Sequence, residues 1–275
     1  MKTDMVYIDQ NNVACSAFTT YSYETDSYSE ARLAFYFEVV QEAAGTHAAQ
    51  RGCSIPDMHK EGKTWVITRS QIEIFRYSRW PEVLNVETWA QEPIRLHLPR
   101  AVKAKDKNGA PVFLAKTYWA VLDLSSNRPL RALDLAQRIG VPPKEDLDHQ
   151  LDMKLAKQED ETESMHVLST FKPRISYLDT DRNQHVNNIS YLNWALDSLP
   201  ASFRNRLKVS EADVSYLRQT YLEDDVMVYT QCSDKNAFSK DEVTLFHYIE
   251  RTEQNGNKTI VWKGQTTWKL REELR

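Results

Sequence analysis

The sequence predicts an α+β protein made of two similar domains, in each of which a curved antiparallel sheet wraps around one buried helix. Two observations carry this prediction. Short motifs recur in the same order in both halves of the chain. Each half also holds one helix-forming stretch that is apolar on nearly all sides, followed by stretches typical of β-strands. With 275 residues, 41% of them hydrophobic, the chain can build two cores of ordinary size.

The internal repeat is supported by residues that match in order and spacing. The matching pairs are Asp26 and Asp181, Tyr36 and Tyr191, and Trp119 and Trp268. The first two pairs are each 155 residues apart and the third is 149 residues apart. Between the halves, 11 of the 21 residues from Lys144 to Ser164 are charged. We therefore expect a first domain over 1–143, a charged linker over 144–164 and a second domain over 165–275.

The helices and strands follow from local patterns. An extended segment is expected to open each half, at Phe18–Thr25 and at Phe171–Asp179. The first apolar helix is expected over Ala31–Ala44, ending near Gly45, and the second over Val186–Leu199, ending at Pro200. Stretches rich in β-branched and aromatic residues predict strands at Thr64–Phe75, Val83–Trp89, Asp225–Cys232 and Glu242–Glu250.

Composition argues against several classes of function. A net charge of −4 provides no general attraction to nucleic acid. The three cysteines, Cys15, Cys53 and Cys232, are odd in number and far apart, which argues against a disulfide framework and fits a reducing cytosol. No apolar run approaches the roughly 18 residues of a membrane span, and no secretory signal is evident. We expect a cytoplasmic protein.

The polar stretch DTDRNQHVNN, from Asp179 to Asn188, leads directly into the second apolar helix. Hydrolytic chemistry needs an activated water and a donor for an oxyanion that develops. The free amide groups at the start of a helix are suited to donate to an anion. A buried helix beside the stretch would place an apolar interior next to it. Asp179 and Thr180 are instead expected to cap the helix.

The stretch DTDRNQHVNN, followed by Tyr191 and Trp194, resembles the signature of acyl-acyl-carrier-protein thioesterases, the fatty-acid-releasing enzymes of plant plastids and their bacterial relatives. The segments Thr64–Trp89 and Asn127–Leu135 resemble the N-terminal half of the same family. The resemblance runs from about Phe18 to Leu270. It implies two tandem hotdog domains, in agreement with the repeat.

The resemblance also implies an active site and a substrate. It places Asp181, Asn183 and His185 at the catalytic positions of the family. Imidazole titrates near neutral pH, at about 6.5, so His185 is the candidate for proton transfer. Asn183 would orient the water or polarise the carbonyl, and Asp181 would orient these two or act as the base itself. The substrate would be a fatty acyl chain on an acyl carrier protein, whose 4'-phosphopantetheine arm makes a separate cofactor unnecessary.

In the first half, the positions aligned with the site carry Asp26, Tyr28 and Glu30. This half keeps the acid but lacks the Asn and the His. We therefore expect the second half to carry the chemistry and the first to form a pseudo-site that governs substrate fit. The repeat also predicts an internal pseudo-dimer, and two chains could further pair as a homodimer.

The sequence departs from the family at one position. Plant members carry a Glu-Cys pair after Tyr-x-Arg, and that Cys has been proposed as a nucleophile. Here Tyr216 and Arg218 are followed by Gln219 and Thr220. Gln219 could still hold a water and Thr220 could contact the substrate, which favours direct attack by water. An acyl-coenzyme A thioesterase of the same fold and a non-catalytic acyl-binding protein remain alternatives.

No metal site is expected, because the remaining histidines form no ligand-spaced cluster: His47, His59, His97, His149, His166 and His247. Docking of an acidic carrier protein would need local basic residues. The first half offers Arg69, Arg76, Arg79, Arg95, Arg100, Lys103 and Lys105. The alternative, that these side chains only solvate strand edges, is at least as good for each of them.

Overall fold

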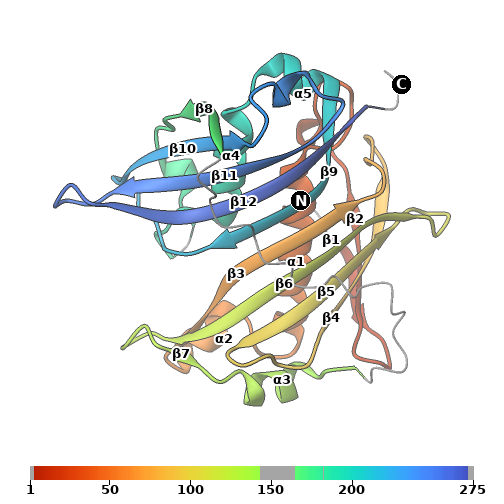
Figure 1. Cartoon of the computed structure of the whole chain (residues 1–275). Helices are drawn as coiled ribbons and strands as arrows, with labels where there is room; N and C mark the ends of the chain where they lie inside the picture. The colour runs from red at the N-terminus through yellow and green to blue at the C-terminus, as the bar shows by residue number, and fades with distance from the viewer. Residues whose placement is uncertain (1–2, 143–164, 182, 272–275) are drawn as a thin grey trace. The chain divides into compact units, whose positions relative to one another are not determined.

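A computed structural model describes residues 3–142, 165–181 and 183–271 of the chain. They belong to two compact units, Met1–Lys154 and Leu155–Arg275 (Figure 1). The expected linker over 144–164 lies outside the described residues. No helix in the described ranges has the length and apolar character that a membrane crossing requires.

The first unit is one antiparallel sheet with a long helix against it. Its strands are β1 (Thr3–Ile8), β2 (Ala14–Thr19), β3 (Lys63–Ile74), β4 (Val83–Ala90), β5 (His97–Lys105), β6 (Pro111–Asp123) and β7 (Pro129–Leu130). They pair in the order β1-β2-β4-β5-β6-β3, and β7 adds to β6. The helices are α1 (Leu33–Gln50), α2 (Ile55–Lys60) and α3 (Leu133–Ile139), and a 3-10 turn, η1, spans Ser22–Glu24.

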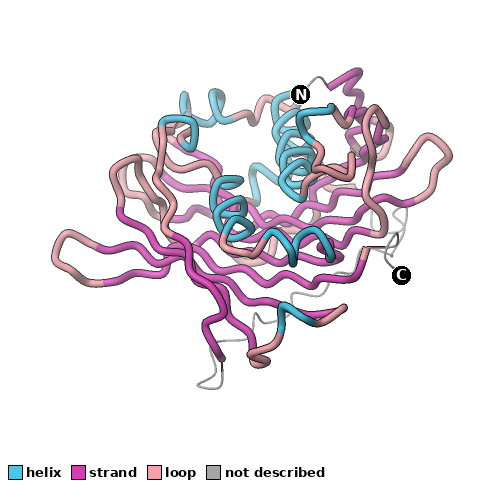
Figure 2. Tube along the Cα trace, turned by 90° about the horizontal axis from the view of Figure 1, so that it is seen from above, coloured by secondary structure: helices cyan, strands magenta, loops and turns pink. Residues whose placement is uncertain are grey.

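The second unit repeats this plan with fewer strands. Its strands are β8 (His166–Phe171), β9 (Leu207–Tyr216), β10 (Asp225–Cys232), β11 (Glu242–Thr252) and β12 (Lys258–Leu270), paired in the antiparallel order β9-β12-β11-β10-β8. The helices are α4 (Asn188–Asp197) and α5 (Ala201–Arg206), and the 3-10 turns are η4 (Tyr177–Asp179) and η5 (Ala237–Ser239). Figure 2 distinguishes helices from strands in both units.

Both central helices are buried on most of their surface, as the sequence predicts. In α1, eleven residues are buried, among them Tyr36, whose ring contacts Phe113 edge-on. In α4, six of the ten residues are buried, including Leu192 and Trp194. The prediction of an α+β chain with one core helix in each half is therefore confirmed, and the four predicted strands correspond to β3, β4, β10 and β11.

The predicted end of the first helix is wrong. The helix continues through Gly45 to Gln50. It stops where Gly52 adopts a left-handed conformation, with φ +63°. There Gly52 N–H donates to Ala49 and Cys53 N–H donates to Ala48 (3.1 and 2.8 Å), which satisfies carbonyls that the helix end leaves free. A glycine inside a helix costs only about 1 kcal/mol, so Gly45 is no barrier when the helix is packed in a core.

The predicted cap of the second helix is also wrong. Asn187 begins α4, and its side chain accepts a hydrogen bond from Ile189 N–H at 2.9 Å. Asp179 lies in the η4 turn, where its carboxylate accepts from the amide and the hydroxyl of Ser176 (both 2.8 Å). The hydroxyl of Thr180 donates to Tyr177 O in the same turn. The residue that caps α4 therefore lies eight positions after Asp179. The local composition predicted the cap at an earlier turn of the chain.

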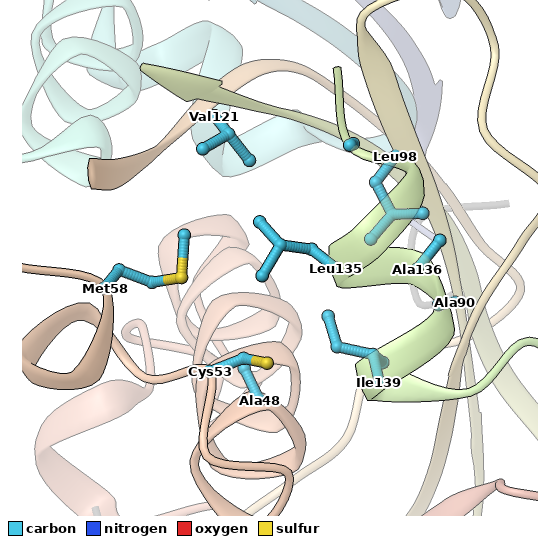
Figure 3. Packing of buried hydrophobic residues seen from close by; sticks show 10 residues of the cluster. Ala48, Cys53, Met58, Ala90, Leu98, Val121, Leu135, Ala136 and Ile139 are labelled. Atoms are coloured by element: carbon cyan, nitrogen blue, oxygen red, sulfur yellow. The ribbon is translucent and has the colours of Figure 1, made fainter. Parts of the chain in front are cut away.

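The short helix α3 packs into a hydrophobic cluster of the first unit (Figure 3). Its buried side chains Leu135, Ala136 and Ile139 share a hydrophobic cluster with Cys53 and Met58, which follow α1. The helix α3 is thereby packed against the core of the first unit.

A buried hydrogen-bonded chain ties α4 to the sheet of the second unit. Ser198 donates to a carbonyl of α4 and contacts Thr230 at 2.8 Å. Thr230 contacts Nδ1 of His247 (2.8 Å), whose Nε2 contacts the hydroxyl of Thr266 (2.8 Å). Thr266 accepts from the indole N–H of Trp268 at 2.7 Å. Since each hydroxyl has one proton, the chain is satisfied when His247 is neutral and carries its proton on Nδ1.

Two glycines are expected to respond in opposite ways to substitution by alanine. A Cβ at Gly264 in β12 would lie 2.9 Å from Cζ3 of Trp262, a fully buried ring that has no room to move. Gly264→Ala is expected to lower the free energy of unfolding by about 1–3 kcal/mol through overpacking. Gly45 is exposed on α1, and a Cβ added there would have no atom within 4 Å. Gly45→Ala is therefore expected to raise stability by up to about 1 kcal/mol, and denaturant titration of both variants checks the pair.

Candidate active site

The loop between η4 and α4 is held together by the carboxylate of Asp181. Its Oδ1 accepts from the backbone amides of Asn183 and His185, at 2.7 and 3.4 Å. The Asp181 amide in turn donates to His185 O at 2.8 Å. Gln184 completes the turn with a left-handed backbone, φ +63°. One oxygen of Asp181 is therefore engaged in shaping the loop.

The first unit contains the same loop. Oδ1 of Asp26 accepts from the amides of Tyr28 and Glu30, at 2.9 and 3.2 Å. The Asp26 amide donates to Glu30 O at 2.8 Å, and Ser29 has the left-handed conformation, φ +59°. These residues lie 155 positions before their counterparts. The acid builds this loop in both halves, with or without the His and the Asn.

The side chains of Asn183 and His185 project from this loop and are half-buried. Neither side chain hydrogen-bonds to another described residue of its unit. The imidazole of His185 does contact the ring of Tyr221 edge-to-face, with the centroids 5.1 Å apart and an interplanar angle of 82°. Both polar groups are therefore available to a ligand.

The segment after β9 lies beside this loop. Val186 N–H donates to Thr220 O at 2.8 Å, which attaches the loop to the segment. Gln219 is exposed, and its Oε1 accepts from the hydroxyl of Tyr221 at 3.3 Å. His185, Tyr221 and Gln219 therefore form a continuous series of contacts. The sequence predicts two of the three members.

Thr220 is fully buried. It lies against Tyr191, whose pKa is raised to about 12 by burial, with a smaller opposing effect from Thr220. The structure thus shows Thr220 as a buried residue that packs against Tyr191. Its contact with substrate stays a prediction.

Arg251 anchors the turn that carries Tyr221. Its Nη1 donates to Gln219 O (2.6 Å) and to the carboxylate of Asp224 (3.3 Å), and its Nη2 pairs with Glu253 (2.7 Å). The carboxylate of Asp224 also accepts from Tyr221 N–H at 2.8 Å. The side chain of Arg251 is only 15% exposed.

The equivalent positions in the first unit form an ion pair instead. Glu30, the counterpart of His185, is buried, and its carboxylate lies 3.5 Å from Nη2 of Arg79. Arg79 N–H donates to Glu82 at 3.2 Å, as Tyr221 N–H does to Asp224 in the second unit. The first unit therefore repeats the backbone framework of the candidate site, but an ion pair between Glu30 and Arg79 occupies the positions of His185 and Tyr221.

The start of α4 offers fewer free amides than the sequence suggested. Asn187 accepts from Ile189 N–H through its side chain and from Ser190 N–H through its carbonyl, at 2.9 and 3.0 Å. Two of the expected oxyanion donors are thus already engaged. The side-chain amide of Asn183 is a candidate donor on the loop, since its backbone amide is already bound to Asp181.

Tyr221 was not predicted from the sequence. A signal existed in the alignment of Ser78–Glu82 with Thr220–Asp224, which are 142 residues apart. Ser78 O and Thr220 O accept from the amides of Ala31 and Val186, respectively, both at 2.8 Å. That alignment makes Tyr221 the counterpart of Arg79. Because Arg79 pairs with Glu30, the counterpart of His185, it predicts that Tyr221 lies beside His185.

The basic residues of the first half do not form an open patch as a set. Arg100 is buried, with Nη1 at 2.9 Å from Nδ1 of His47. Arg76 pairs with Glu82 and Asp106, and Lys105 pairs with Glu87, so these charges are engaged within their own unit. Arg100 is therefore unable to meet a docking partner at the surface.

Comparison with known families finds two matching models. The model of the acyl-ACP thioesterase N-terminal domain matches residues 11–136, and that of the acyl-ACP thioesterase C-terminal domain matches residues 157–270.

Curated relatives come from plants. A chloroplastic palmitoyl-acyl carrier protein thioesterase of Arabidopsis thaliana is 27% identical over 264 residues, which cover 91% of this chain and 62% of the relative. The chloroplastic oleoyl-acyl carrier protein thioesterase 2 of the same plant is 27% identical over 280 residues, covering 92% of this chain and 75% of the relative. The chain thus spans less than two thirds of the length of the first of these proteins.

Solved structures share the fold. An acyl-ACP thioesterase from Bacteroides thetaiotaomicron superposes with a TM-score of 0.76 at 22% identity, covering 94% of this chain and 99% of that one. The 12:0-ACP thioesterase from Umbellularia californica gives a TM-score of 0.80 at 19% identity, covering 96% and 100%. These likenesses confirm the predicted fold of two tandem hotdog domains.

Proposed function

The chain belongs to the acyl-acyl-carrier-protein thioesterase family, and on this premise we propose that it hydrolyses the thioester of a fatty acyl-acyl carrier protein to release the free fatty acid. One observation carries the proposal furthest. The same Asp-built loop occurs in both units, but only the second unit presents a His and an Asn whose side chains make no hydrogen bond within the described part of that unit.

In the proposed reaction, a water oxygen attacks the carbonyl carbon of the thioester. A ring nitrogen of His185 accepts a proton from this water as the C–O bond forms. The side-chain amide of Asn183 donates a hydrogen bond to the carbonyl oxygen of the thioester as negative charge develops on that oxygen. The C–S bond then breaks, and the proton held by His185 passes to the sulfur of the departing pantetheine arm. The products are a carboxylic acid and a thiol, and no separate cofactor is consumed.

Asp181 and Gln219 support these two groups. Asp181 holds the loop, because its carboxylate accepts from the amides of both Asn183 and His185. Gln219 accepts from Tyr221 through its Oε1, which leaves its Nε2 group to hold the water. The first unit, where Glu30 and Arg79 occupy the equivalent positions, would serve substrate fit instead of chemistry.

Attack by water needs no cysteine. Cys53 and Cys232 are buried, and their thiols lie near the carbonyls of Arg51 (3.4 Å) and Thr244 (3.6 Å). Cys15 is partly buried in the first unit, and burial raises the pKa of its thiol, which disfavours the reactive thiolate. None of the three belongs to the loop or to the segment at Gln219. The fold and the loop thus support direct hydrolysis.

The carrier is tested by comparing two donors that bear the same acyl chain. Hydrolysis of acyl-acyl carrier protein is expected with a kcat/KM at least about 10-fold above that for acyl-coenzyme A, if contacts beyond the shared pantetheine arm add about 1.4 kcal/mol or more. Release of free thiol measures both reactions. A higher kcat/KM on acyl-coenzyme A would contradict the assigned carrier, and no turnover with either donor would contradict the enzyme itself. The cytoplasmic location stays a prediction, since the plant relatives are named as chloroplastic.

A further inference from the structure

Tyr221 is the one residue whose ring contacts the imidazole of His185 among the described residues of the unit. The two rings meet edge-to-face, 5.1 Å between centroids and 82° between planes. This is the favoured geometry for a pair of aromatic rings. Within the described part of the unit, His185 lacks the hydrogen bond that a histidine engaged in proton transfer commonly donates to a carboxylate or a carbonyl, which orients its ring. Among the described residues of the unit, the ring of Tyr221 is therefore the contact that bears on its orientation.

Tyr221 is itself held by several hydrogen bonds of its turn, although the residue is 46% exposed. Its backbone amide donates to Asp224, and its hydroxyl donates to Gln219. Arg251 binds both Asp224 and the carbonyl of Gln219. The turn therefore fixes the tyrosine ring from both its backbone and its hydroxyl.

The first unit provides an internal comparison. Arg79 stands where Tyr221 stands, and it reaches across to Glu30 just as Tyr221 reaches across to His185. In both units, the residue after Ser78 or Thr220 contacts the side chain at the same position of the loop. The framework thus places a partner at this point, and in the second unit the partner is aromatic and uncharged.

From this geometry we infer that Tyr221 is a positioning residue: its ring fixes the imidazole of His185 for proton transfer. This inference rests on the proposed function, because it assigns Tyr221 a role through His185. The aromatic ring is the active feature, and the hydroxyl serves mainly to hold the ring through Gln219. Misplacement of a catalytic group by about 1 Å can lower a rate by as much as about 100-fold, so the loss of the ring should be visible in kcat.

Four variants of the full chain separate the ring from bulk and from the hydroxyl. Tyr221→Leu removes the ring but keeps apolar bulk, and it is expected to lower kcat by about 10-fold with KM changed less than about three-fold. Tyr221→Phe keeps the ring and is expected to restore kcat to within about three-fold of wild type. Leu222→Ala removes an exposed apolar side chain from the same turn and serves as the matched control. His185→Gln identifies the histidine signal in the spectra.

A proton NMR spectrum of the free protein detects the contact between the rings of Tyr221 and His185 independently of enzyme activity. The imidazole C–H signals of His185, identified by their loss in His185→Gln, carry a ring-current shift from Tyr221. They are expected to move in Tyr221→Leu and to stay in place in Leu222→Ala. Unmoved signals in Tyr221→Leu, or a Tyr221→Leu enzyme with wild-type kcat, would overturn the inference. A loss of kcat in Tyr221→Phe as large as in Tyr221→Leu would also overturn it, since the hydroxyl would then be the active feature.

The two proposals fail separately. If the wild-type protein hydrolyses neither donor, the proposed function fails, whatever the spectra show. If it hydrolyses acyl-acyl carrier protein but neither kcat nor the His185 signals respond to the loss of the ring, the role of Tyr221 fails alone.

Discussion

Replacing His185 by alanine is expected to lower kcat on acyl-acyl carrier protein by about 100-fold or more, the usual scale for loss of acid–base catalysis. The thermal midpoint should change little, because the imidazole is half-buried and its removal leaves no buried group of the described unit without a partner. Steady-state kinetics and thermal unfolding of the same preparation measure both quantities. Asn183→Ala is expected to behave similarly, since this side chain also has no hydrogen bond within the described unit.

The first unit supplies the control for this experiment. Glu30→Gln changes the residue equivalent to His185, and kcat is expected to stay within about three-fold of wild type. The side chain of Glu30 is only 6% exposed, so Gln, which keeps its size and an accepting oxygen, is chosen over a truncation, and the thermal midpoint is measured with kcat. Wild-type turnover in a folded His185→Ala protein would refute the site assignment.

Asp181→Asn decides which residue is the base. The amide oxygen of Asn can still accept from the backbone amides of Asn183 and His185, so the loop should persist. If Asp181 mainly shapes the loop, this variant retains kcat to within about 10-fold. A loss as large as that of His185→Ala would instead make the carboxylate the base.

Replacing His247 by alanine is expected to lower the free energy of unfolding by about 3 kcal/mol or more. The change removes the acceptor of the buried Thr266 hydroxyl and one of the two partners of the Thr230 hydroxyl, at about 1–3 kcal/mol for an unsatisfied group. It also opens a cavity behind β11. Denaturant titration at pH 7 measures the loss. His166→Ala, at a half-buried position in β8, is the matched control and should cost much less.

The same histidine makes stability depend on pH. Burial lowers the pKa of His247 to about 3, whereas an unfolded chain binds this proton near pH 6.5. Between these values the unfolded state binds more protons, so stability rises with pH and falls on acidification below about 6.5. The slope approaches about 1.4 kcal/mol per pH unit for one histidine. His47 is expected to add a similar component, because burial and then the charge of Arg100 lower its pKa to about 3.

Comparing pH 5 with pH 7 isolates the contribution of His247. The wild-type protein should lose more stability between these values than His247→Ala does, because the variant has lost a site that is protonated near pH 6.5 only when the chain unfolds. An identical loss in both proteins would show that the chain of hydroxyls does not hold His247 neutral.

Much of the architecture was predictable because it depends on local pattern. A helix that is apolar on nearly all sides must be covered, and Phe35, Tyr36 and Phe37 already show this in three consecutive positions. Strands reveal themselves by β-branched and aromatic residues, as in Asp225–Cys232, whose predicted bounds match β10. The polar loop before α4 was also recognisable, because its residues are adjacent in the chain.

Element ends were less predictable, since several local signals compete for them. Gly45 looked like the end of a helix, but packing carries α1 onward to the left-handed turn at Gly52. Asp179 and Thr180 looked like caps, but both are used within η4, and Asn187 takes the position. Composition identifies residues able to end or cap a helix but not the one that the fold uses.

The sequence by itself determined the two-unit α+β plan, the repeated Asp loop and the residues Asn183 and His185 that it presents. Only the tertiary structure placed Tyr221 against His185, 36 positions earlier in the chain, and buried Arg100 beside His47, 53 positions earlier. The physical reason is that such contacts depend on strand register and on how each helix packs, and a shift of one residue would turn every side chain of a strand to the opposite face. Residue types and spacing along the chain carry the first kind of information, and the folded core alone decides the second.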